Sequence, residues 1–266
     1  MLKLPPELAT QPAVPPLMGP LERLRVVLVA PQEPGNVGAA ARAMRNFGLS
    51  RLWLVNPLPR VLEDLRDPHS QALRMAVHAE EILRGCTVVD TLDRALEGTA
   101  LVVGTTGRPR EIYPAPLCTP REAALSIAQV ARRQEVALVF GRETFGLTND
   151  ELDASSLIVQ IPTAPEQPSL NLAQAVLLLA YEVFLALAAP PRSQPARASY
   201  EAMKGLFEDL EAYLLEVGFT DSHRLPYARR RIQRILQKAE LTPGEVQILR
   251  GLLHQSRWYR NKPDDS

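Results

Sequence analysis

The sequence has few of the residues that build disulfides and metal centres. Among 266 residues there are two cysteines, Cys86 and Cys118, and they lie too far apart to form a zinc-binding pair. The four histidines show neither HExxH nor HxH spacing. We therefore expect no disulfide framework and no metal site.

Long apolar runs and a net charge are also lacking. No apolar stretch approaches the roughly 20 residues that a membrane-spanning helix needs, and the N-terminus has no apolar segment of the kind found in signal peptides. The chain holds 30 basic and 30 acidic residues, so its formal net charge is zero. We expect a soluble, cytoplasmic protein with no membrane partner, in which nucleic-acid binding would depend on a local excess of basic residues.

Common nucleotide-binding motifs are absent. The loop after the first apolar run reads PQEPGNVG, which contains Gly35 and Gly38 but not the GxGxxG pattern of dinucleotide-binding proteins. The chain has no GxxxxGK[ST] phosphate loop either. These absences argue against NAD-linked and nucleotide-hydrolysing enzymes.

The central part of the chain alternates between short apolar runs and helical patterns. Runs rich in β-branched residues occupy 24–30, 51–55, 87–90, 100–106, 136–141 and 157–162. Helical patterns occupy 37–47, 69–84, 92–98, 120–133 and 169–188. Apolar strands separated by helices are typical of a parallel sheet that is covered on both faces. The sequence therefore predicts an α/β domain over residues 23–189.

Prolines separate this domain from the two ends of the chain. Residues 1–20 hold six prolines, so 1–22 are expected to form an extended tail, and 190–198 a proline-rich linker. Beyond the linker every pattern is helical. Gly218 is placed to end one helix, and a capping box at 242–245 begins another that is expected to reach about Ser256. Residues 199–260 are predicted to form a small all-helical module.

Polar residues gather where the predicted strands end, which is where open parallel sheets bind ligands. In the first such loop Asn36 is placed to cap a helix, and Gly38 with the alanines after it would let a large group approach. Arg42 and Arg45 lie about one turn apart and suit two-pronged phosphate contacts. The alternative is a tightly packed, capped helix with two solvated arginines.

Further loops carry more polar residues than a turn requires. The segment FGRETFGL at 140–147 sets an arginine and a glutamate between two glycines; the alternative is a strand-to-helix turn with a surface ion pair. Later, IP at 161–162 precedes SLN at 169–171, whose serine or asparagine would cap the long helix. A weaker signal is the small polar stretch GTTGR at 104–108.

Together, NxGxxxR at 36–42, FGxExxGL at 140–147 and P…SLN at 162–171 resemble the three ordered motifs of the SPOUT methyltransferases that modify ribose 2′-hydroxyls of RNA. The helical module makes the resemblance nearest to members that act on tRNA. The resemblance covers residues 24–188 strongly and about 199–260 more loosely. It implies a trefoil-knotted parallel-sheet domain, followed by the small all-helical C-terminal module.

The resemblance also implies a cofactor, S-adenosylmethionine, and no metal. It places the cofactor against Thr105, Thr106, Gly107, Gly141, Glu143, Ile161, Ser169, Leu170 and Asn171. Gly141 and Gly146 would let the backbone wrap closely around this ligand, while Glu143 would order the loop.

Catalysis is assigned by the same resemblance to Arg42, with Asn36 and Ser169 orienting the ribose. A guanidinium holds its proton too firmly to be a convenient base. We therefore expect Arg42 to fix the adjacent phosphate and to stabilise the developing alkoxide, with phosphate or solvent taking the proton. The family builds its sites across a homodimer, so one subunit would supply Arg42 and the other the cofactor loops.

RNA binding is expected from a basic stripe in the helical module. Residues 222–239 contain six arginine and lysine residues and no acid, which is the pattern of a phosphate-binding surface. The residues expected to contact RNA are Arg45, Arg229, Arg230, Arg231, Arg234 and Lys238. The alternative is a solvated helix face that pairs with the acidic helix before it.

The function implied by the resemblance is S-adenosylmethionine-dependent methylation of a ribose 2′-hydroxyl in tRNA, at a pyrimidine at position 32 of the anticodon loop. Two alternatives remain open. A ribose methyltransferase acting on ribosomal RNA would share the three motifs, and only the helical module favours tRNA. A non-catalytic RNA-binding dimer would keep the basic stripe but would not need intact cofactor loops.

Overall fold

A computed structural model describes residues 18–107, 113–189 and 196–260. Its centre is a parallel sheet of seven strands in the order β3-β2-β1-β6-β4-β7-β5. The strands are β1 (Leu24–Val29), β2 (Arg51–Val55), β3 (Thr87–Val89), β4 (Thr99–Thr106), β5 (Leu117–Cys118), β6 (Glu135–Phe140) and β7 (Leu157–Gln160). Strand β1 is buried at every residue, and β4 and β6 at all but one each. Such burial explains their unbroken apolar sequences.

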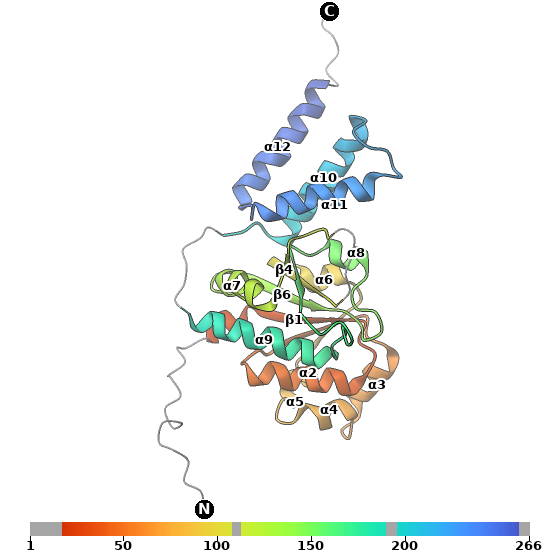
Figure 1. The fold of residues 1–266 in the computed structure, drawn as a ribbon, viewed down its shortest axis with the longest axis vertical. Helices are drawn as coiled ribbons and strands as arrows, with labels where there is room; N and C mark the ends of the chain where they lie inside the picture. Colours follow the sequence, from red (N-terminus) through yellow and green to blue (C-terminus); the bar gives the residue numbers. More distant parts are fainter. Residues whose placement is uncertain (1–17, 108–112, 190–195, 261–266) are drawn as a thin grey trace, which may run out of the picture.

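Helices cover both faces of this sheet (Figure 1). One face is covered by α2 (Pro34–Asn46), α4 (Gln71–Ala76), α5 (Glu80–Arg84), α7 (Pro120–Ala131) and α9 (Leu172–Ala188), with α1 (Met18–Glu22) and α3 (Pro59–Arg66) contributing at its margin. The other face is covered by α6 (Leu92–Leu96) and α8 (Asn149–Asp153). The predicted α/β architecture is confirmed. The trefoil knot stays a prediction.

The helical module is also confirmed. It consists of α10 (Tyr200–Glu216), α11 (Leu225–Lys238) and α12 (Pro243–Arg260), which pack around Leu206 and Val246. Gly218 ends α10 with a φ of 71°, and Thr242 and Glu245 form the capping contacts at the start of α12. Helix α12 continues to Arg260, one turn beyond the predicted end. No helix in the described part of the chain is both long and apolar enough to span a bilayer.

Several elements differ from the sequence prediction. The stretch 69–84 is two helices, because Val77 and His78 have positive φ values of 31° and 66° and interrupt it. Residues 18–22 form a short helix where an extended tail was expected, while 1–17 lie outside the described residues. Of the predicted linker, 190–195 lie outside them too. Its last residue, Ala198, is buried and donates its N–H to the carbonyl of Leu241 at 2.8 Å.

The start of α2 also differs. The helix begins at Pro34, so Asn36 lies inside its first turn and does not cap it. A Cβ at Gly38 would overlap the backbone of Ala72 in α4. The small residues of this turn therefore admit a neighbouring helix, which is the packing alternative, and not a ligand.

Candidate active site

The loops singled out from the sequence converge at one edge of the sheet. Strands β6, β4 and β7 are neighbours, and the pairing of Gly104 with Val139 and of Thr106 with Gln160 sets their carboxyl ends close together. The loops that follow these strands therefore meet. This edge is where open parallel sheets bind ligands.

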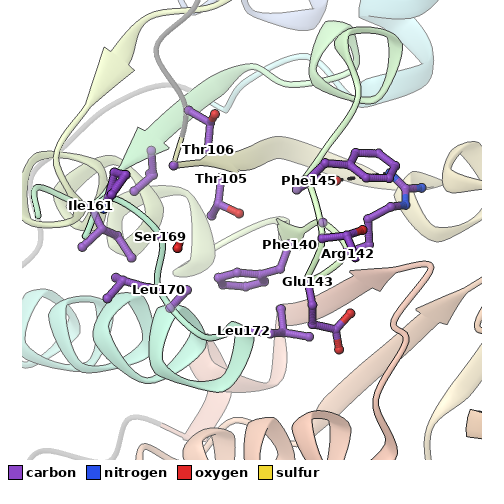
Figure 2. A pocket seen from close by; sticks show the side chains of 17 residues that line it. Thr105, Thr106, Phe140, Arg142, Glu143, Phe145, Ile161, Ser169, Leu170 and Leu172 are labelled. Carbon is purple, nitrogen blue, oxygen red and sulfur yellow. Dashed lines mark hydrogen bonds between the residues drawn. The ribbon is translucent and has the colours of Figure 1, made fainter. Parts of the chain in front are cut away.

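A cavity of about 340 Å³ opens between these loops (Figure 2). Eight of the nine residues predicted to bind the cofactor line it: Thr105, Thr106, Gly107, Gly141, Glu143, Ile161, Ser169 and Leu170. The ninth, Asn171, is not in its wall. Figure 2 shows Ile161 and Leu170 toward one end of the cavity and Phe145 and Arg142 toward the other, with Phe140 between them.

Gly146, which was expected to let the backbone approach the ligand, also lines the cavity. The wall contains further residues that the sequence analysis missed: Phe140, Arg142, Thr144, Phe145, Val159, Pro168, Leu172 and Ala175. Most of them adjoin a predicted residue along the chain. The last apolar residue of each strand could have been included, because it lies directly beneath the loop that follows. Phe145 gave a separate signal, since an aromatic residue in a polar loop is unusual; its side chain is 46% exposed.

Glu143 links the loop 141–147 to helix α2; because this loop is predicted to bind the cofactor, it is called the cofactor loop below. Its carboxylate accepts hydrogen bonds from the backbone N–H of Gln32 at 2.9 Å, from that of Glu33 at 3.1 Å and from Nδ2 of Asn36 at 3.0 Å. A carboxylate at the start of a helix is favoured by the free N–H groups and the helix dipole. Glu143 thus supplies, from more than a hundred residues away, part of the capping that was expected of Asn36.

Asn36 and Asn171 complete a chain of hydrogen bonds between the three motifs. Nδ2 of Asn171 donates to Oδ1 of Asn36 at 2.8 Å, and Asn36 in turn donates to Glu143. Asn171 also caps α9, because its Oδ1 accepts from the N–H of Ala173 at 2.9 Å. The asparagine of SLN is therefore the cap, and the serine hydroxyl of Ser169 is left exposed at the cavity.

The loop 141–147 is closed by its own backbone. The N–H of Gly146 donates to the carbonyl of Arg142 at 2.8 Å, and Gly146 has a φ of 73°. A Cβ at Gly141 would overlap the backbone of Gly146 and Leu147. Gly141 is thus required to close the loop, before any contact with a ligand is considered.

Arg142 forms an ion pair with Glu151 of α8. Its Nη1 and Nη2 donate to the two carboxylate oxygens at 2.9 and 2.7 Å, and both side chains are largely buried. Burial raises the pKa of the Glu151 carboxyl, but hydrogen bonds from Arg142 and Thr148 outweigh this effect and hold the pKa below its usual value. The Arg142 guanidinium lies 4.9 Å from the centre of the Phe145 ring. This pair is two-pronged and largely buried, unlike the surface ion pair offered as the alternative for this turn.

Arg42 lies outside the cavity. Its side chain is exposed on α2, and among the described residues it has no hydrogen-bond or ion-pair partner. Arg45, one turn later, is paired with Glu81. A single chain therefore does not bring Arg42 to the cofactor residues.

The basic stripe of α11 is divided between two environments. Arg229 pairs with Glu211 of α10 at 2.8 Å, and Arg230 pairs with Asp153 of α8 at 3.1 Å, as the solvated-face alternative supposed in part. Arg231 stacks on Tyr227, its guanidinium 4.7 Å from the ring centre. Arg234 and Lys238 are exposed and have no polar partner among the described residues. These last two remain free for phosphate contacts.

Within the described ranges, no cluster of three or more His, Cys, Asp or Glu side chains could hold a metal ion. The cavity combines apolar walls with hydroxyls and backbone groups, a lining that suits an organic ligand with a ring and a polar chain.

A parallel sheet with a ligand cavity at the carboxyl ends of its strands defines the class of α/β ligand-binding domains, and comparison with known proteins identifies the family. The chain belongs to the SpoU rRNA methylase family, whose model matches residues 23–181. A second family model, that of the C-terminal domain of tRNA methyltransferase TrmJ, matches residues 201–265.

Relatives cover most of the chain. It is 43% identical over 241 residues to tRNA (cytidine/uridine-2'-O-)-methyltransferase TrmJ of Klebsiella pneumoniae, which covers 88% of this chain and 96% of that protein. The TrmJ crystal structure from Z. mobilis has a TM-score of 0.72 at 34% identity and covers 88% of this chain and 98% of that one. A methylase-family protein from Neisseria gonorrhoeae has a TM-score of 0.63 at 35% identity, and the match covers 75% of this chain and 98% of that one. The resemblance read from the three motifs is confirmed.

Proposed function

We propose that this protein transfers a methyl group from S-adenosylmethionine to a ribose 2′-hydroxyl of tRNA. The observation that carries the proposal is the cavity at the ends of β4, β6 and β7, around which the three motifs are joined by the hydrogen bonds of Glu143, Asn36 and Asn171. The match of residues 201–265 to the TrmJ C-terminal domain, together with full-length TrmJ relatives, favours tRNA over ribosomal RNA. The pyrimidine at position 32 stays a prediction.

The cavity fits the cofactor in size and in chemistry. Its volume of about 340 Å³ lies at the small end of the range typical of small-molecule sites. Ile161, Val159 and Leu170 offer an apolar surface for an adenine ring, and Thr105, Ser169 and the loop backbone offer polar groups for a ribose and an amino acid chain. When bound, the cofactor supplies an electrophilic methyl group.

The protein's contribution to the reaction is positioning and charge stabilisation. Methyl transfer is an in-line displacement, which depends on holding the hydroxyl oxygen in line with the methyl group. Ser169 is exposed at the cavity, and its hydroxyl would orient the ribose. Arg42, a free cation, would hold the neighbouring phosphate and stabilise the alkoxide that forms as the proton leaves. Asn36 already bonds Asn171 and Glu143 through the two ends of its amide. A contact with the ribose would therefore use its second N–H or the second lone pair of its oxygen.

A homodimer would complete this site. Leu177, Tyr181 and Leu185 recur every four residues along α9 and are 37%, 44% and 42% exposed. An apolar stripe of this kind is typical of a helix that packs against a partner. Because Arg42 lies outside the cavity of its own chain, a second subunit is the natural source of the arginine that faces the cofactor.

Two measurements test the proposal. Calorimetry with S-adenosylmethionine and S-adenosylhomocysteine should detect binding without RNA, since the cavity lies within one domain. Mass spectrometry of nucleosides from tRNA and from ribosomal RNA, incubated with protein and labelled cofactor, should find the label in 2′-O-methylated pyrimidines of tRNA. Folded protein that binds neither ligand at millimolar concentration would refute the proposal, and label in ribosomal RNA alone would select the other substrate.

A further inference from the structure

The short helix α8 joins the cofactor loop to the helical module. It spans Asn149–Asp153, directly after loop 141–147, and faces the module's helix α11 (Figure 1). One of its three carboxylates, Glu151, accepts from Arg142 in the wall of the cavity at 2.7 Å. A second, Asp153, is bonded to the module. Helix α8 is therefore bonded at once to the cofactor site and to the predicted RNA-binding unit.

The contacts between α8 and α11 are close and largely buried. Arg230 donates from Nε and Nη2 to the two carboxylate oxygens of Asp153, at 3.1 and 3.3 Å. Gln233, which is only 2% exposed, donates from Nε2 to the backbone carbonyl of Asp153 at 2.6 Å. The Asp153 side chain is itself 11% exposed. These groups therefore bond to each other and are largely buried from solvent.

The position of α8 depends on such contacts. A helix of five residues cannot be stable by itself, since isolated helices shorter than about 12 residues are marginal in water. It is fixed by the capping box of Thr148, by the buried Leu152, and by polar contacts on its two sides. A cavity of about 400 Å³, lined by Asp153 and Gln233 among others, lies beside the contact with α11.

We propose that Arg230 and Gln233 are positioning residues for the cofactor loop, which they hold through α8, Glu151 and Arg142. The inference rests on the proposed function, because it assumes that the cavity binds S-adenosylmethionine. It changes the role of Arg230, which the sequence placed among the RNA contacts. Removing Arg230 leaves a largely buried Asp153 carboxylate unpaired. Helix α8 then shifts, and the Glu151 clamp on Arg142, with the Phe145 ring that lies on Arg142, is loosened.

Helix α11 provides a matched control for this proposal. Arg234 lies one turn after Arg230 on the same helix, carries the same charge, and is exposed without a polar partner among the described residues. If either arginine contacts a phosphate of the RNA, its removal would weaken RNA binding. A loosened cofactor loop would follow only from the change at Arg230.

The test compares Arg230→Ala with Arg234→Ala in the full-length protein, using calorimetry with S-adenosylhomocysteine in the absence of RNA and filter binding with tRNA. We expect Arg230→Ala to weaken S-adenosylhomocysteine binding by about threefold or more, the scale of coupling through such networks, and to raise KM for the methyl donor. Arg234→Ala should leave S-adenosylhomocysteine binding unchanged and weaken tRNA binding.

Milder variants keep the test decisive if Arg230→Ala unfolds. Asp153→Asn preserves shape but removes the charge, and Arg230→Lys keeps the charge without a fork that spans both oxygens. Each should weaken S-adenosylhomocysteine binding less than Arg230→Ala, and Asp153→Asn combined with Arg230→Ala should be less than additive. The inference would be overturned if Arg230→Ala bound S-adenosylhomocysteine with wild-type affinity and its tRNA binding were weakened as much as that of Arg234→Ala. Arg230 would then be a phosphate contact. Failure of the wild-type protein itself to bind the ligand would instead refute the proposed function.

Discussion

Three glycines line the cofactor cavity, and a methyl group added to each would meet a different environment. At Gly141 a Cβ would overlap the backbone of Gly146 and Leu147. At Gly146 it would meet nothing within 4 Å, but the φ of 73° is unfavourable for any residue with a side chain. At Gly107 it would lie 3.5 Å from the carbonyl oxygen of Pro168, an ordinary contact. Single alanine substitutions should therefore have graded effects.

The expected change in the free energy of unfolding differs among these three environments. Gly141→Ala must open the loop and should reduce the free energy of unfolding by about 1–3 kcal/mol, the usual cost of forcing atoms into a packed site. Gly146→Ala should cost about 1 kcal/mol, the left-handed backbone penalty alone. Gly107→Ala should stay within about 0.5 kcal/mol. For a domain of this size 1 kcal/mol corresponds to a melting-temperature shift of about 2–4 °C.

Thermal unfolding of the three variants, with and without S-adenosylhomocysteine, measures both quantities. Gly141→Ala should melt lowest and should show no ligand-induced rise in melting temperature, because the opened loop no longer forms the wall of the cavity. Gly107→Ala should melt like the wild type. If Gly141→Ala keeps the wild-type melting temperature and ligand affinity, the backbone contact between Gly141 and Gly146 does not control the loop, and the reasoning from this geometry is wrong.

Two further predictions concern the acceptor side of the reaction. Arg42→Ala should leave S-adenosylhomocysteine binding intact and lower turnover by about a hundredfold, while Arg42→Lys should recover little of the lost turnover. Mixing Arg42→Ala protein with inactive Gly141→Val protein should restore activity if the subunits exchange and share the site. A mixture that stays inactive after verified exchange would contradict a shared site. The double variant Arg234→Glu, Lys238→Glu should weaken tRNA binding in a filter-binding titration, and the slope of the salt dependence should fall by about one for each phosphate that is no longer neutralised. The control Arg66→Glu changes an exposed charge on the distant helix α3 and should leave both the affinity and the slope unchanged.

The centre of the sheet was predictable from the sequence because its strands β1, β4 and β6 are buried on both faces. Strands such as β1 and β6 read as unbroken apolar runs, and in a chain that alternates such runs with helices this pattern is typical of a buried parallel sheet. The short elements were not predictable, because they have too few apolar residues to form a pattern. Helix α8 has four polar residues among its five, and β5 has two residues in all, so neither carries a periodic signal.

The site could be predicted as a set of residues but not as a set of contacts. Residue types and motif order placed Glu143, Asn36 and Asn171 in three separate loops. In each loop a local role, as a helix cap or as part of a turn, was enough to explain the residue. Which of them caps which helix depends on side chains distant in sequence, and the structure differs from the local expectation at Asn36. There a carboxylate brought in by the fold takes the place of the cap that local preference favours.

The hydrogen bonds among these three residues have a mechanical consequence. Glu143 belongs to the cofactor loop, Asn36 belongs to the helix that carries Arg42, and Asn171 caps the helix whose apolar stripe is exposed for a partner. The wall of the cavity, the arginine proposed to be catalytic and the proposed dimer surface are therefore built on elements that hydrogen bonds connect to one another. A displacement of the cofactor loop would act first on the start of α2, because it would break the hydrogen bonds that Gln32, Glu33 and Asn36 donate to Glu143. It would reach α9 only through the bond between Asn36 and Asn171, since the cap that Asn171 gives to Ala173 does not involve Glu143. The sequence motifs lie far apart along the chain, yet hydrogen bonds connect them in the fold.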